Sequence, residues 1–187
     1  MSAPVCSTIF DVLFWYIDRA LNDNEYLQPQ KMHRVLYLSQ AYYAAINRRV
    51  LMPAVFVAHE LGPLEPNVFR IFSSTERPYI EHFMLPENVE HFLDSIWRRF
   101  GHHSGDYLTR LLKSHQPYAE SFARGAGSEI TIAAMASFYG RPRSETQVRA
   151  EGAPDPSQVL KPRVLRTQTG KPVAVKAWSP GKIGTRK

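Results

Sequence analysis

The chain is poor in cysteine and in long apolar runs. Its single cysteine, Cys6, has no partner for an internal disulfide, which excludes a disulfide-framed fold. No run of about 18 uncharged apolar residues occurs, so we expect no membrane-spanning helix. The first residues lack a basic start, and Asp11 and Asp18 interrupt their apolar stretch, which is unlike a secretory signal. These absences together predict a cytoplasmic protein.

Net positive charge is missing from most of the chain and is gathered near its C-terminus. The whole chain carries +6 at neutral pH. Residues 141–187 hold 11 basic and 3 acidic side chains, a net charge of +8; residues 1–140 hold the remaining 12 basic and 14 acidic ones, a net charge of −2. Attraction to nucleic acid or to an acidic protein therefore belongs first to the C-terminal segment.

The first 140 residues have the pattern of helices separated by proline and glycine. Apolar residues at helical spacing predict helices over residues 7–21, 29–46 and 66–72. Residues 51–60 are ambiguous, and we expect an extended or single-turn connector there. Residues 86–100 show the strongest pattern, with acidic residues in the first turn, arginines in the last turn and Gly101 directly after it.

Three shorter helices are predicted after Gly101, with Ser104, Pro117 and Thr131 near their first turns and Gly140 at the end of the last one. Residues 141–187 contain 6 of the 14 prolines and only scattered apolar residues, too few to offset the entropy of ordering. We therefore predict an all-α domain of six to seven helices over residues 1–140, with room for one short extended connector. A disordered basic tail is predicted over residues 141–187.

None of the seven histidines lies in a metal-binding motif. His59 and Glu60 match the start of the zincin motif H-E-x-x-H, but Pro63 stands where the second histidine belongs. His102 and His103 are adjacent, so on a helix their side chains would point about 100° apart. We interpret the histidines as surface or hydrogen-bonded side chains and predict no metal and no other cofactor.

Motifs for nucleophilic catalysis and phosphate binding are also missing. Ser104 follows a histidine, but a helix is expected before it, which does not fit a nucleophile elbow; helix capping explains this serine. The glycine-rich stretch 124–128 has no strand before it and no lysine after its last glycine, so we interpret it as a loop. The sequence therefore predicts a protein that is not an enzyme. An enzyme of unrecognised type would need a polar cluster around His59, Glu60 and His115.

The cations of the tail leave three alternatives open. A flexible cationic arm binds phosphates in a salt-sensitive way, which fits a nucleic-acid-binding accessory or regulatory protein. The same arm also fits a solubilising tail or a segment that folds over an acidic protein partner. The candidate partner-binding residues of the tail are Lys161, Arg163, Arg166, Lys171, Lys176, Trp178 and Lys182.

Residues 30–72 carry the most specific pattern in the chain. A glutamine-lysine pair is followed by a tyrosine and a glutamine-alanine pair, and then by a glycine-proline pair and a proline that opens a short helix. The residues are Gln30, Lys31, Leu36, Tyr37, Gln40, Ala41, Ala58, His59, Gly62, Pro63, Leu64, Pro66, Val68 and Phe69. A second block follows at Phe100, Gly101, Ser104, Leu108, His115, Pro117 and Tyr118, and a closing helix at residues 130–140.

With these blocks, the chain resembles the Panacea domain, the SocA/GepA-like antitoxin domain, over roughly residues 8–140. It departs from the family at His59 and Tyr118, where the family usually has tryptophan. The family pattern has no counterpart for the tail beyond Gly140.

The resemblance implies a bacterial antitoxin that binds and neutralises a cognate toxin encoded by an adjacent gene. In the SocA branch the antitoxin also delivers its toxin to a AAA+ protease. A repurposed member, for example a phage-associated one, is the other possibility. The resemblance implies no catalytic residue and no cofactor.

The residues that carry the resemblance also fit a purely structural role. Glycine and proline at this spacing shape a turn and start a helix. The polar residues upstream of the turn then have a simple function, which is to form hydrogen bonds with it. These residues are Lys31, Tyr37 and Gln40.

Overall fold

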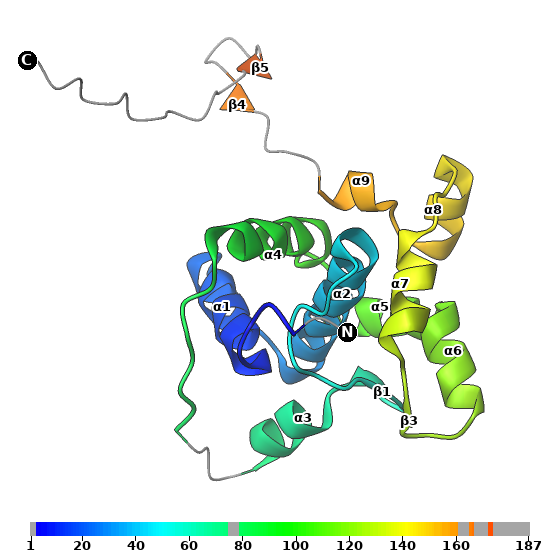
Figure 1. The fold of residues 1–187 in the computed structure, drawn as a ribbon, viewed down its shortest axis with the longest axis horizontal. Helices are drawn as coiled ribbons and strands as arrows, with labels where there is room; N and C mark the ends of the chain where they lie inside the picture. The colour runs from blue at the N-terminus through cyan, green and yellow to red at the C-terminus, as the bar shows by residue number, and fades with distance from the viewer. Residues whose placement is uncertain (1–2, 75–78, 161–164, 167–171, 174–187) are drawn as a thin grey trace, which may run out of the picture.

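Figure 1 shows the computed structural model of the protein, which describes residues 3–74, 79–160, 165–166 and 172–173. The described residues form nine helices and five short strands. The helices are α1 (Ile9–Asn22), α2 (Pro29–Asn47), α3 (Pro66–Ser73), α4 (Glu87–Phe100), α5 (Gly105–Ser114), α6 (Gln116–Ala123), α7 (Ile132–Gly140), α8 (Glu145–Glu151) and α9 (Pro156–Val159). The strands are β1 (Val57–His59), β2 (Gly62–Leu64), β3 (Ser128–Glu129), β4 (Leu165–Arg166) and β5 (Pro172–Val173).

The fold is mostly helical, as predicted, but it is not all-α. β1 and β2 form an antiparallel hairpin, with Val57 opposite Leu64 and His59 opposite Gly62, and β3 pairs with the other edge of β1. The ambiguous connector of the sequence therefore contains the central strand of a three-stranded sheet. The two residues of β3 are too few to show an alternating apolar pattern, which explains why the sequence does not reveal this strand.

Helix α2 is the centre of the fold. All of its residues from 31 to 44 are buried, and it packs against α1, α4, α5, α7 and the β1–β2 hairpin. Figure 1 shows α2 enclosed by these elements. Pro29 occupies its first turn, where a missing N–H leaves no bond unmade, and Arg48 follows its end in the left-handed conformation, with φ of 51°.

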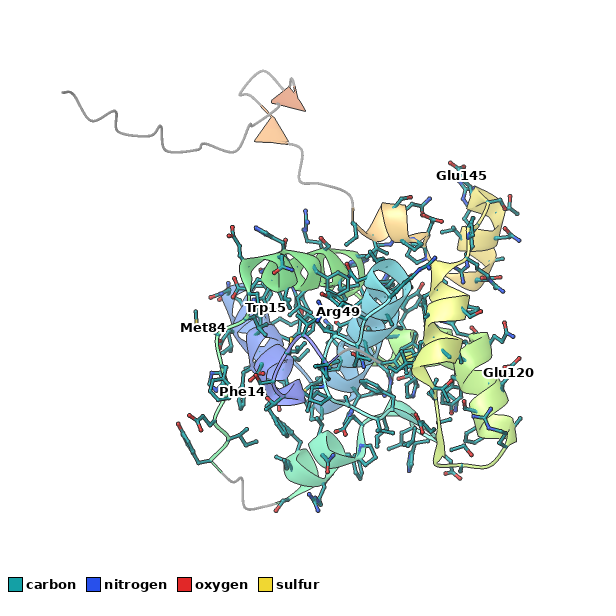
Figure 2. The ribbon with its side chains drawn as sticks, in the orientation of Figure 1. Phe14, Trp15, Arg49, Met84, Glu120 and Glu145 are labelled. Carbon is teal, nitrogen blue, oxygen red and sulfur yellow. The ribbon has the colours of Figure 1, made fainter. Side chains whose placement is uncertain are left out.

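Buried aromatic side chains fill the space around α2. Figure 2 draws the described side chains on the ribbon, with Trp15 of α1 labelled. The polar ends of the buried aromatic side chains have partners inside the core. The hydroxyl of Tyr16 lies 2.7 Å from Oγ of Ser39, and the hydroxyl of Tyr42 donates to the carbonyl oxygen of Pro154 at 2.9 Å. Because buried polar atoms are costly to leave unpaired, these bonds fix how α1 and residue 154 lie against α2.

Residues 141–160 differ from the prediction, because they pack on the helical domain. Ala153 and Val159 are buried, and the side chain of Arg143 lies over the ring of Phe138, 4.6 Å from its centroid. The guanidinium of Arg143 also donates to Glu151 at 2.8 Å. The composition of this segment predicts disorder because it has few apolar residues. Some of those few are buried against the helical domain, however, and backbone carbonyl groups of the segment accept hydrogen bonds from core side chains.

The predicted boundary after Gly140 thus falls inside the packed part of the chain. Arg166 belongs to β4, whose backbone pairs with β5. The other six candidate residues of the tail lie outside the described residues; they are Lys161, Arg163, Lys171, Lys176, Trp178 and Lys182. No helix of the described residues is long and apolar enough to cross a membrane.

Candidate functional site

The turn of the β1–β2 hairpin is fastened to α2 by one buried arginine. Arg34 is 1% exposed; its Nη1 donates to the carbonyl oxygen of Pro63 at 2.6 Å and its Nη2 donates to that of Leu61. Its Nε donates to Oγ1 of Thr109 at 2.9 Å. Burial lowers the pKa of Arg34 to about 10, so the guanidinium stays charged at neutral pH. It pairs with no carboxylate among the described residues, and a buried charge held only by neutral acceptors is unusual.

Thr109 links this arginine to the start of α2. Its hydroxyl donates to the carbonyl oxygen of Gly105 at 2.8 Å, so it accepts from Arg34 and from Nε2 of Gln30, which lies 3.1 Å away. A hydroxyl has one proton to donate and two lone pairs, and all three are used here. Gln30 also donates to Asp106 at 3.1 Å. This network fixes the orientation of Gln30 and Arg34 against α5.

Gly62 lets the hairpin approach Arg34 closely. Its φ is +106°, a backbone conformation that favours glycine. A Cβ atom at this position would lie 2.8 Å from Nη2 of Arg34. The sequence element Gly62-Pro63 thus has a structural role as well as a place in the family pattern.

His33, the neighbour of Arg34, contacts the start of α3. Its Nδ1 accepts from the backbone N–H of Glu65 at 3.3 Å. Glu65 in turn caps α3, because its carboxylate accepts from the backbone N–H of Val68 at 2.7 Å. His33 is 4% exposed, and burial together with the charge of Arg34 lowers its pKa to about 4. The ring is therefore neutral, and its remaining proton is on Nε2.

These side chains line a groove of about 330 Å³ between the first turns of α2, the hairpin turn and α3. We call it the α2–α3 groove; its lining residues are Pro29, Gln30, His33, Arg34, Leu61, Leu64, Phe69, Phe72 and Ser73. Leu61 is 55% exposed and Phe69 is 41% exposed. Apolar side chains gathered around a few fixed polar groups are typical of binding sites.

A larger depression of about 580 Å³ lies between α2, α4 and the residue that follows α9. The charged groups in it balance each other, since Arg98 pairs with Asp94 at 3.0 Å. Ser95 is also satisfied, because it donates to the carbonyl oxygen of His91 at 2.9 Å. This depression therefore has no unbalanced charge to attract a ligand, and the smaller α2–α3 groove is the stronger candidate.

His115 is a second buried histidine, and both of its nitrogens are used. Nε2 lies 2.8 Å from the carbonyl oxygen of Glu151, which only accepts, so Nε2 carries the proton. Nδ1 lies 2.7 Å from the hydroxyl of Tyr139, which therefore donates to it. Burial lowers the pKa of His115 to about 4. The side chain joins α5, α7 and α8, which is a structural role.

The predicted polar residues upstream of the hairpin do not bind its turn. Nζ of Lys31 pairs with Glu25 and lies 5.1 Å from the centre of the Trp97 ring. The ring centre of Tyr37 lies 6.2 Å from that of Tyr139 in α7, and its hydroxyl forms no hydrogen bond with the turn. Arg34, which the sequence pattern does not single out, binds the turn instead.

Gln40 holds a different loop. Its side-chain amide donates to the carbonyl oxygen of Met52 at 3.1 Å and accepts from the N–H of the same residue at 3.2 Å. An amide that forms both bonds to one residue acts like a strand partner and fixes the chain after α2. The role is structural, but it lies away from the turn that was expected.

The remaining residues of the family pattern lie around the hairpin and in α6. The carbonyl oxygen of Ala58 accepts from the backbone of Gly127 at 2.8 Å, and the carbonyl oxygen of His59 accepts from the hydroxyl of Tyr118 at 2.7 Å. The ring of His59 lies 6.3 Å from that of Phe69. Pro66 and Pro117 occupy the first turns of α3 and α6.

The polar cluster that an unrecognised enzyme would need does not form. No hydrogen bond or ring contact joins His115 to His59 or Glu60 among the residues that the structure describes. Within the same part of the chain, no group of three histidine, cysteine or acidic side chains is placed to hold a metal ion.

Sequence reasoning missed the two most important polar residues of the α2–α3 groove. His33 and Arg34 lie in a helix that is buried on all sides, so they interrupt an apolar pattern that is already weak. The available signal was an arginine next to a histidine in the middle of a helix rich in apolar residues. Such residues are rarely buried unless they have a specific role.

Comparison of the chain with protein-family models, with curated proteins and with solved structures gave no match. The resemblance to the Panacea domain therefore stays a prediction based on the residues quoted above.

Proposed function

We propose that the protein is a cytoplasmic antitoxin, which neutralises a cognate toxin by direct binding, and that the α2–α3 groove forms part of its binding surface. The strongest support is that separate parts of the family pattern meet at one groove. Gln30 in α2, Leu64 in β2 and Phe69 in α3 come from three parts of the family pattern, and all three line the same groove. A groove that combines exposed apolar side chains with buried polar ones suits a protein partner.

The proposal includes, as a second step, delivery of the bound toxin to a AAA+ protease, which the family resemblance implies.

Co-expression with the product of the neighbouring gene tests the proposal. We expect the full-length protein to restore growth and to capture that product in a pull-down. Phe69→Ala removes an exposed aromatic side chain from the groove and is expected to weaken capture about tenfold or more, as for other interface aromatics. Tyr107→Ala is the matched control, because Tyr107 is 40% exposed and lies outside the groove.

Failure of the full-length protein to capture or neutralise any neighbouring product contradicts the proposal. Recovery of nucleic acid in its place, with binding that is lost as salt increases, would support the cationic tail as an arm for nucleic acid. Equal capture by the Phe69 and Tyr107 variants would remove the groove from the binding surface while leaving the antitoxin role.

A further inference from the structure

The α2–α3 groove contains a hydrogen-bond donor without a partner. The Nε2–H group of His33 is not bonded to any described residue, although the ring is 4% exposed and lines the groove. Its other nitrogen is occupied by Glu65, which fixes both the tautomer and the direction of the ring. His33 therefore presents a fixed donor to whatever enters the groove.

The charge of the groove is positive and unbalanced. Among the described residues that line the groove, Arg34 is the only formally charged side chain. The acidic groups beside this network form no ion pair with Arg34: Glu65 caps α3, and Asp106 accepts from Gln30. Three hydrogen bonds to neutral acceptors use three of the five N–H groups of Arg34.

The walls of the groove are apolar. The ring centre of Phe69 lies 6.4 Å from that of His33, and Leu61 of the hairpin turn also lines the groove. A volume of about 330 Å³ is at the small end of ligand sites and suits one or two bulky side chains rather than a whole domain.

We infer that the α2–α3 groove binds an acidic, apolar-anchored protein segment: a carboxylate accepts the proton of His33 Nε2–H beside the guanidinium of Arg34, and a neighbouring bulky apolar side chain packs on Phe69 and Leu61. The inference rests on the proposed function for the identity of the protein that supplies the segment. A carboxylate fits better than a neutral acceptor, because it also balances the buried charge of Arg34. A single guanidinium between apolar walls fits a carboxylate better than a nucleic-acid backbone, whose binding sites are rich in cations.

Synthetic peptides test this chemistry with the full-length protein. The probe is acetyl-Gly-Phe-Glu-Leu-Gly-amide, and its control carries glutamine in place of glutamate. We expect the glutamate peptide to bind at least about tenfold more tightly in calorimetric titrations, because a hydrogen bond to a charged acceptor is stronger than one to a neutral acceptor. A second pair, acetyl-Gly-Phe-Leu with a free or an amidated C-terminus, distinguishes a side-chain carboxylate from a chain end.

Variants locate the binding. His33→Phe keeps a ring of similar size but removes the donor, so it is expected to remove the preference for glutamate over glutamine. His91→Phe is the matched control, since the side chain of His91 is 76% exposed and outside the groove. The comparison of the glutamate and glutamine peptides uses the unaltered protein, so it remains a valid test even where a variant folds poorly.

Equal affinity for the charged and neutral member of both peptide pairs, or no binding of any peptide, overturns the inference. Those results leave the antitoxin proposal intact if the neighbouring product is still captured. A clear preference for carboxylate without capture of any neighbouring product would support the groove chemistry and contradict the antitoxin proposal.

Discussion

His33 and His115 are equally buried but are used differently. Each is less than 5% exposed, and burial lowers the pKa of each to about 4. His115 binds a tyrosine hydroxyl and a carbonyl oxygen, whereas His33 binds one backbone N–H and leaves a donor in the α2–α3 groove. Burial and pKa alone therefore do not separate a structural histidine from a binding one. The two roles are separated by the number of hydrogen-bond partners that each ring nitrogen has.

The largest expected effect comes from removing the segment that completes the His115 region. A chain ending at Gly140 loses the carbonyl partners of His115 and Tyr42 and exposes the surface under Val159. We expect a loss of about 5 kcal/mol or more in the free energy of unfolding, which is a third or more of the roughly 5–15 kcal/mol of a typical domain. Urea titration of this form and of a chain ending at Leu160 checks it. Equal stability of the two truncated chains would show that residues 141–160 add nothing.

Acid should act on both histidines in the same direction. The folded pKa of about 4 is below the unfolded value of about 6.5, so the folded state binds fewer protons. The associated stability is complete above pH 6.5 and is lost as the pH falls toward 4, by up to about 3 kcal/mol per histidine. Denaturant titrations at several pH values measure this loss. A free energy of unfolding that stays constant between pH 6.5 and 4 would contradict the burial of both rings.

Replacement of each histidine by phenylalanine sharpens the comparison. His115→Phe leaves the hydroxyl of Tyr139 and the carbonyl oxygen of Glu151 without their partner, and we expect a loss of about 3 kcal/mol. His33→Phe leaves only the N–H of Glu65, for about 1 kcal/mol. Equilibrium unfolding in urea gives both values. The distinction between the two residues fails if His33→Phe is as destabilising as His115→Phe.

Substitution of two glycines with positive φ distinguishes the cost of backbone strain from the cost of a steric clash. Gly62→Ala places a Cβ 2.8 Å from Arg34, whereas Gly127→Ala, at φ of +86°, meets no atom within 4 Å. We expect a loss of about 1 kcal/mol for Gly127→Ala from strain alone and about 2 kcal/mol for Gly62→Ala. Thermal unfolding of the two variants checks the order. If Gly127→Ala is the more destabilising change, the hairpin is not pressed against Arg34 as described.

Helix positions were largely predictable from the sequence, because their signals are local. The predicted helix over residues 86–100 matches α4, and Thr8 begins α1 with a capping box that includes Asp11. The small sheet and α8 to α9 were not predictable in this way. The strands of the sheet are only two or three residues long. The prolines before α9 led to a prediction of disorder, but the carbonyl oxygen of Pro154 accepts a hydrogen bond from the core and Pro156 starts α9.

The α2–α3 groove was predictable in part. Gln30 and Phe69 were singled out by the family pattern and do line it. His33 and Arg34 were not, because their function depends on which backbone groups the fold brings to them. The carbonyl groups that Arg34 binds lie in a turn nearly thirty residues further along the chain, and the sequence of α2 does not indicate that they are near.

Nitrogen-detected magnetic resonance of the histidine rings tests the difference between His33 and His115 most directly. Spectra of the full-length protein, with and without the glutamate peptide, report which nitrogen of each ring is protonated and whether its proton gains an acceptor. We predict Nε2–H tautomers for both rings, and a shift of the His33 Nε2–H signal alone when the peptide is added. A proton on Nδ1 of His33, or a His33 signal that stays unchanged while the peptide binds, would contradict the role assigned to this histidine.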